Sequence, residues 1–243
     1  MDPIIEISEG AKKFLKKLIS LFDAEDLHYV LIGALPLILN HIRLERHTKD
    51  MDFVILLEGK EFEDICKILK HNGLRKTNIP HRFVNEEEKI IVDIIPVSKE
   101  IISRGEIYWP TGERMDTTGI EYALENFRIY RLGTGVKVAE VPAVILLKLI
   151  AWKDSKELKH LKDILRTLED YERKGERRFE IVEEMDDYDL AGAYILGKDI
   201  ARMVNTKVKE KAINIVRKIL KECSLLSESE RNLLKAFIMG MEA

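Results

Sequence analysis

The sequence has 243 residues, of which 46% are hydrophobic and 34% charged, with a formal net charge of −3 at pH 7. A chain of this length can bury a sizeable core, and its acidic balance excludes a general attraction to nucleic acid. No apolar run approaches the ~20 residues of a membrane span, so we expect no membrane helix and, from the N-terminal residues, no signal peptide. Two widely separated cysteines suggest a cytoplasmic protein with free thiols.

The first 138 residues predict a mixed α/β region. Apolar residues at helical spacing predict a helix over residues 8–23, with Ser8 as its N-cap. A short strand over 28–32 ends at Gly33, and a helix from Ala34 to about Ile42 follows. Beyond these, we expect a strand over 51–57, a helix over 61–72, a hairpin of 82–84 with 89–95, a helix over 120–125, and strands near 127–132 and 135–138.

The character of the chain changes at Pro142. From there the apolar residues follow a 3.6-residue period, which predicts helices over residues 142–153, 157–171, 188–204, 207–222 and 227–240. We therefore expect an α/β domain over residues 1–138 and a helical domain over residues 139–243.

Two aspartates one residue apart, Asp50 and Asp52, begin an apolar strand. Side chains in a strand alternate between faces, so both carboxylates share one face while Met51 and Phe53 share the other. Neighbouring carboxylates at a buried strand repel each other and lose solvation, and a divalent cation between them relieves both costs. The pair predicts a metal and, behind it, a phosphate.

Asp93 is a third carboxylate in an apolar strand. Taken alone, a salt-bridged aspartate explains it as well as a functional one does. Together with Asp50 and Asp52, however, it forms a set typical of a site for two magnesium ions. Gly33 and Ala34, between a strand and a helix, are small enough to let the backbone approach a phosphate.

These residues resemble a known family. Gly33, the pattern Arg46-x-Thr48-x-Asp50-x-Asp52, and the segments 92–95 and 147–151 are similar to nucleotidyltransferases of the polymerase-beta-like superfamily. The resemblance covers residues 29–171 and points in particular to the AbiEii-like branch, the toxins of type IV toxin–antitoxin systems. It implies an α+β fold, in which a mixed β-sheet with flanking helices precedes a helical C-terminal half. It also implies metal-dependent transfer of a nucleoside monophosphate from an NTP to a hydroxyl, with release of pyrophosphate.

The resemblance also implies roles for single residues. Asp50 and Asp52 would hold two Mg²⁺ ions, or Mn²⁺ in their place. Asp93 would be the third ligand and the base for the acceptor hydroxyl, and Lys148 would hold the triphosphate. The remaining nucleotide-binding residues would be Gly33, Ala34, Arg46, Thr48, Lys49 and Asp163.

The chain departs from the family pattern at two places. Ala34 stands where the family often has glycine or serine. His160 stands where the family usually has the first aspartate of a Lys-Asp-x-x-Asp motif. The second change affects the contribution of the helical half more than it affects the metal site.

Several of these assignments have alternatives. Lys148 could extend to the surface from its apolar helix. Lys159 and Asp163, four residues apart, could be a surface ion pair. Arg46 and Lys49 could pair with the aspartates instead of a phosphate. The charged run 173–178 could be a solvated loop or could contact an RNA acceptor.

The acceptor is also open. The resemblance allows an RNA end such as that of tRNA, a protein side chain, or a small molecule such as an aminoglycoside. A cognate antitoxin would be a further partner. One alternative function is a degenerate member of the family that binds a nucleotide or a partner protein without turnover. Another is a helical interaction protein, which would leave the three aspartates unexplained.

Overall fold

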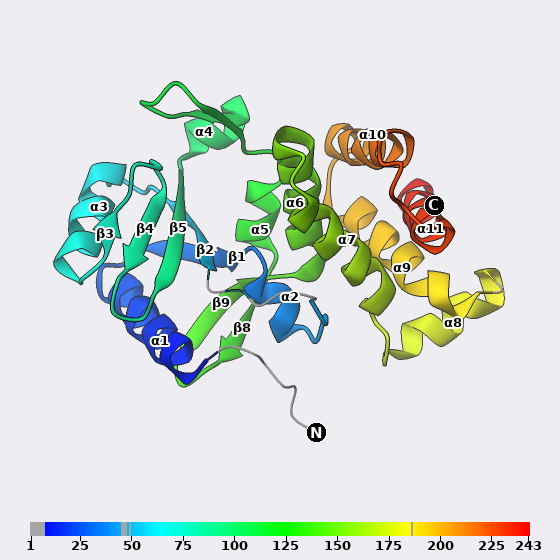
Figure 1. Ribbon diagram of the computed structural model, residues 1–243, viewed down its shortest axis with the longest axis horizontal. Coiled ribbons are helices and arrows are strands. Elements are labelled where there is room, and N and C mark those ends of the chain that lie inside the picture. The colour runs from blue at the N-terminus through cyan, green and yellow to red at the C-terminus, as the bar shows by residue number, and fades with distance from the viewer. Residues whose placement is uncertain (1–7, 45–47, 49, 186) are drawn as a thin grey trace. The chain divides into compact units, whose positions relative to one another are not determined.

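The computed structural model describes residues 8–44, 48, 50–185 and 187–243 (Figure 1). It divides into two compact units: Met1–Leu39 with Glu45–Glu140, and Asn40–Leu44 with Val141–Ala243. The division predicted between residues 138 and 139 falls inside the last strand of the first unit. Whether the two units fold as separate domains stays a prediction. None of the described helices is long and apolar enough to cross a membrane.

The first unit holds all the described strands and five helices. In chain order its elements are α1 (Glu9–Ala24), β1 (His28–Ile32), α2 (Leu35–Leu39), β2 (Asp50–Leu56), α3 (Phe62–His71), β3 (Arg75–Lys76), β4 (Arg82–Asn85), β5 (Ile90–Val97), α4 (Lys99–Arg104), β6 (Glu106–Tyr108), β7 (Arg114–Asp116), α5 (Ile120–Glu125), β8 (Phe127–Arg131) and β9 (Gly135–Ala139).

Seven of the described strands form one mixed sheet in the order β3-β4-β5-β2-β1-β9-β8. Strand β2 lies at its centre, parallel to β5 on one side and antiparallel to β1 on the other. Strand β9 is parallel to β1, and the outer pairs β3–β4, β4–β5 and β8–β9 are antiparallel. Strands β6 and β7 form a separate hairpin.

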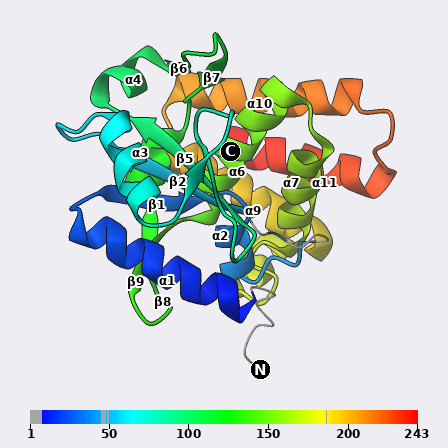
Figure 2. The same cartoon turned by 60° about the vertical axis from the view of Figure 1, so that its left-hand side comes forward.

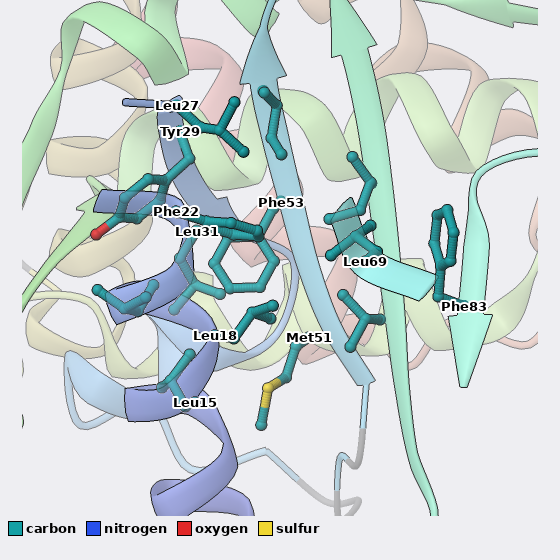
Figure 3. Close-up of a cluster of buried hydrophobic side chains, with 14 of the residues drawn as sticks. Leu15, Leu18, Phe22, Leu27, Tyr29, Leu31, Met51, Phe53, Leu69 and Phe83 are labelled. Atoms are coloured by element: carbon teal, nitrogen blue, oxygen red, sulfur yellow. The ribbon is translucent and has the colours of Figure 1, made fainter. Parts of the chain in front are cut away.

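The core of the first unit lies on one face of this sheet. Met51 and Phe53 of β2 point into it and meet apolar side chains of α1 and α3, the helices that cover this face (Figures 1 and 2). The ring of Phe22 meets that of Phe53 edge-on, with centroids 5.3 Å apart (Figure 3). Because strand side chains alternate, burying Met51 and Phe53 here sends Asp50 and Asp52 to the opposite face.

Most predicted elements of the first unit are present, and Ser8 caps α1 by accepting a hydrogen bond from the backbone N of Ala11. The helix predicted from Ala34 to Ile42 is shorter, because it ends at Leu39 and His41 takes a left-handed backbone with φ of 65°. The short elements β3, α4, β6 and β7 were not predicted from the sequence.

The second unit is helical, with α6 (Val141–Ser155), α7 (Leu158–Asp170), α8 (Glu176–Met185), α9 (Tyr188–Met203), α10 (Thr206–Glu222) and α11 (Glu228–Glu242). Helices α9 and α11 cross with their backbones in contact. A Cβ on Gly197 would overlap the carbonyl oxygen of Phe237, and one on Gly240 would overlap that of Tyr194. Glycine is therefore what allows this close crossing.

The interpretation of residues 173–178 as a charged loop is confirmed for residues 173–175 and wrong for the rest, because α8 begins at Glu176 and Arg178 is buried. Its Nε donates to the carbonyl oxygen of Tyr171 at 2.8 Å and its Nη2 donates to that of Glu169. The guanidinium thus satisfies carbonyls at the C-terminal end of α7. The predicted fold class, a mixed sheet with flanking helices followed by a helical half, is confirmed.

Candidate functional site

Three of the predicted site residues lie on one face of the central sheet. Asp52 of β2 is directly opposite Asp93 of the parallel strand β5, and Asp50 is two residues before Asp52 on the same face. Across β5, Asp93 is opposite Arg82 of β4. Arg82, Asp93 and Asp52 therefore form a row across three adjacent strands. We call these residues, with Asp50, the carboxylate face.

Gly33 closes one side of the carboxylate face. It follows Ile32, which is the partner of Asp52 on β1, and its φ of 79° is in the left-handed region that favours glycine. A Cβ at this position would overlap Oδ2 of Asp52. The predicted turn therefore requires glycine at position 33 for two reasons, the left-handed backbone and the close approach of the Asp52 carboxylate. The next residue, Ala34, is buried, and its carbonyl oxygen accepts the first hydrogen bonds of α2.

Arg82 engages both oxygens of Asp93. Its Nε donates to Oδ1 at 2.8 Å and its Nη2 donates to Oδ2 at 2.7 Å. Asp93 is 7% exposed, whereas the Arg82 side chain is 30% exposed. This is the bidentate geometry in which an arginine and a carboxylate pair most strongly.

The charge of Arg82 acts on the whole carboxylate face. The hydrogen bonds to Asp93 raise the pKa of Arg82 above its usual range, and the charges of Asp93, Asp50 and Asp52 add to this effect. Next to it, burial lowers the pKa of His81, whose ring lies 5.3 Å from that of Trp109. Within the described part of the chain, the carboxylate face therefore combines three carboxylates with the permanent cation of Arg82.

The residues present fit a divalent cation in part. Asp50 and Asp52 are half-buried carboxylates on one face, and carboxylate oxygens are the donors that Mg²⁺ and Mn²⁺ prefer. Asp93 is turned toward Arg82 instead. Among the described residues, no three His, Cys, Asp or Glu side chains are grouped so that they could hold one ion. The three-aspartate metal site stays a prediction.

The link before β2 carries three further predicted residues. Arg46 and Lys49 lie outside the described residues, so their predicted contacts with phosphate stay untested. Thr48 is described, and its Oγ1 accepts a hydrogen bond from the backbone N of Asp50 at 3.3 Å. Thr48 thus helps to shape the start of the aspartate strand, and a contact with nucleotide stays a prediction.

Lys148 and Asp163 pair with each other inside the second unit. Lys148 on α6 is 5% exposed and donates from Nζ to Oδ2 of Asp163 on α7 at 2.7 Å. Lys148 therefore does not reach the surface. The alternative of a surface pair between Lys159 and Asp163 is also wrong, because Lys159 pairs with Glu157 at 2.7 Å. Whether Lys148 or Asp163 binds a nucleotide stays a prediction.

His160, which stands where the resemblance predicts an aspartate, is half-buried on α7. Burial first, and then the charges of Lys148 and Lys159, lower its pKa to about 4. Its Nδ1 has no hydrogen-bond partner within the described part of the chain. His160 is therefore neutral at pH 7.

Asp170 at the end of α7 anchors the segment that leads toward the aspartate strand. It accepts hydrogen bonds from the backbone N of Arg43 at 3.1 Å and from Nη2 of Arg43 at 3.0 Å. Nη1 of Arg173 donates to it at 2.8 Å, and Nε of Arg166 lies 3.4 Å away. Burial opposes the charge of Asp170, but these arginines outweigh burial and lower its pKa to about 2.

Asn in place of Asp170 is expected to destabilise the protein by about 2 kcal/mol at pH 7. The folded pKa of about 2 lies below the ~3.9 of an unfolded aspartate, so this stabilisation is complete above about pH 4 and is lost as the pH falls toward 2. Urea unfolding of both proteins at pH 7 and at pH 2.5 measures the difference. If the free energies of unfolding of the two proteins differed by the same amount at both pH values, the anchor role of Asp170 would be contradicted.

The main site residue that the sequence analysis missed is Arg82. The predicted hairpin did contain a signal for it, because pairing Asn85 with Ile90 places residue 82 opposite residue 93. The contact between Arg43 and Asp170 could not be predicted in this way, because the two residues are 127 positions apart in the sequence.

Two of the solved structures that are similar to this chain are an antibiotic-resistance factor and a nucleotidyltransferase-like protein. No protein-family model matches the sequence, and no curated protein does. The antibiotic-resistance factor ANT(2'')-Ia, solved in solution, shares 14% identity over 66% of this chain and 83% of its own, with a TM-score of 0.45. An antigenic nucleotidyltransferase-like protein from Paracoccidioides brasiliensis shares 14% identity over 76% of this chain and 92% of its own, with a TM-score of 0.47. At this level of similarity neither structure assigns an activity to the chain.

Proposed function

We propose that the chain is a metal-dependent nucleotidyltransferase, which transfers a nucleoside monophosphate from an NTP to a hydroxyl group. The observation that supports this most is the pair Asp50 and Asp52, which share one face of β2 next to the glycine turn at Gly33. Two half-buried carboxylates side by side are costly unless a cation binds them, and a nucleoside triphosphate is a substrate that arrives with such a cation.

In the proposed reaction the acceptor oxygen attacks the α-phosphorus, a new P–O bond forms, and pyrophosphate leaves with the electrons of the broken bond. Asp50 and Asp52 would hold Mg²⁺ or Mn²⁺, which neutralises charge on the phosphates when it is bound. The backbone that follows Gly33 lies beside Asp52, where its N–H groups could meet a phosphate oxygen. The hydroxyl proton passes to a base, the role predicted for Asp93.

The class of acceptor is also part of this proposal. The resemblance to AbiEii-like toxins favours an RNA end or a protein side chain over a small molecule. It also makes a cognate antitoxin an expected partner.

A protein that binds a nucleotide without turnover is the second candidate. The bidentate contact of Arg82 favours it, because that contact occupies both oxygens of the carboxylate predicted to act as the base. The two hydrogen bonds leave only one lone pair on each oxygen of Asp93 for the proton of an acceptor.

Label transfer distinguishes the two candidates. The purified protein is incubated with Mg²⁺ or Mn²⁺, total RNA or lysate, and each common NTP labelled at either the α- or the γ-phosphorus. A nucleotidyltransferase is expected to attach label from one or more α-labelled NTPs to RNA or protein, none from the γ-labelled ones, and to stop when EDTA is added. Metal-dependent NTP binding with no transfer or pyrophosphate release would contradict the proposal and support the second candidate.

A further inference from the structure

The contacts of Asp93 conflict with its predicted role as a metal ligand. The conflict rests on the proposed function, because it concerns carboxylates of the same site. Asp93 is buried, and Arg82 donates to both of its oxygens at 2.7 and 2.8 Å. A guanidinium in this geometry takes the positions from which a carboxylate best binds a cation, and it repels a divalent ion that approaches.

The charges of the carboxylate face support the same conclusion. Among the described residues of this face, three carboxylates and one guanidinium sum to a charge of −2, which a single divalent cation cancels. Arg82 interacts electrostatically with Asp50 and Asp52 as well as with Asp93. A cation supplied by the chain therefore already stands beside Asp93, where the sequence predicts a shared second metal ion.

We infer that Asp93 is the anchor of Arg82 and not a metal ligand. Asp93 thereby holds Arg82 as a permanent cation beside Asp50 and Asp52, and only these two aspartates bind a divalent ion. In this arrangement Asp93 is a positioning residue, which acts on the site through Arg82.

Unfolding experiments without metal separate the two roles by the sign of their effect. With EDTA, Asp93→Asn is expected to lower the midpoint of thermal unfolding by about 5 °C, because Arg82 loses its partner. If Asp93 were a vacant metal ligand, removing its charge would relieve repulsion with Asp52 and raise the midpoint. Asp50→Asn is the matched control, and its midpoint in EDTA is expected to equal or exceed that of the wild type.

Adding Mn²⁺ tests the ligands directly. We expect a concentration-dependent rise of the midpoint in wild type, a rise of similar size in Asp93→Asn, and almost none in Asp50→Asn. A loss of the rise in Asp93→Asn, or a higher midpoint for this variant in EDTA, would overturn the inference. Absence of any rise in wild type would argue against the metal site of the proposed function, and the EDTA comparison would still decide the role of Asp93.

Arg82 itself gives an independent readout. Arg82→Met is expected to tighten Mn²⁺ binding about tenfold in calorimetric titration, because a nearby positive charge is removed. Arg75→Met is a matched control, since Arg75 on β3 pairs with Glu86 and does not contact Asp93. If Arg82→Met does not fold, Arg82→Lys serves in its place, because lysine keeps the charge and loses the bidentate contact. Its midpoint of thermal unfolding in EDTA is expected to fall by less than that of Asp93→Asn. Unchanged Mn²⁺ affinity in Arg82→Met, or an unchanged midpoint in Arg82→Lys, would overturn the inference.

Discussion

Replacing Asp50 with asparagine is expected to slow nucleotidyl transfer about a thousandfold, an effect of about 4 kcal/mol on the activation barrier. The substitution keeps the shape of the side chain and removes a charged oxygen that would bind the cation. The backbone N of Asp50, which donates to Thr48, is unchanged, so the start of β2 should be preserved. The loss should therefore affect the reaction and not the fold.

The initial rate of transfer from the α-labelled NTP measures this effect. Asp64→Asn is the matched control, because Asp64 is an exposed aspartate on α3 that pairs with Lys67 at 2.9 Å. It removes the same charge from the first unit and is expected to retain the wild-type rate. A rate for Asp50→Asn within tenfold of wild type would exclude Asp50 as a ligand of the reacting metal.

The face of the aspartate strand could be predicted from the sequence because it follows from a local rule. Alternation places Asp50 and Asp52 opposite Met51 and Phe53, and the core buries the latter two. Gly33 was also predictable, since a strand followed directly by a helix requires a sharp turn. The sequence could not predict that a Cβ at position 33 would overlap Asp52, because this overlap depends on where the side chain of Asp52 lies across the sheet.

Interactions between elements far apart in the sequence were the hardest to predict. The sequence predicts that Arg178 belongs to a charged surface segment. It is buried instead, because Gly192 on α9 leaves room for its guanidinium. The early end of α2 at Leu39 is followed by a left-handed backbone at His41, a conformation that only a few per cent of residues other than glycine adopt. Such features depend on how helices pack, which the period of one helix does not encode.

Lys148→Met is expected to destabilise the protein by about 3–5 kcal/mol, the usual cost of removing one member of a buried ion pair. The side chains of Lys148 and Asp163 are 7% and 3% exposed, and their 2.7 Å contact joins α6 to α7. In the variant Asp163 must remain buried without this cation, or take up a proton at a free-energy cost of similar size. Urea unfolding at pH 7 measures the loss.

The double variant Lys148→Met, Asp163→Leu distinguishes an unpaired charge from lost packing. Because two apolar side chains can replace a buried ion pair at little cost, we expect the double variant to recover most of the stability that Lys148→Met loses. A loss below about 1 kcal/mol in the single variant would contradict the burial of the pair. If the stable double variant still transferred nucleotide at the wild-type rate, the predicted role of Lys148 in holding the triphosphate would be wrong. A folded but inactive double variant would indicate that the pair serves the reaction as well as the fold.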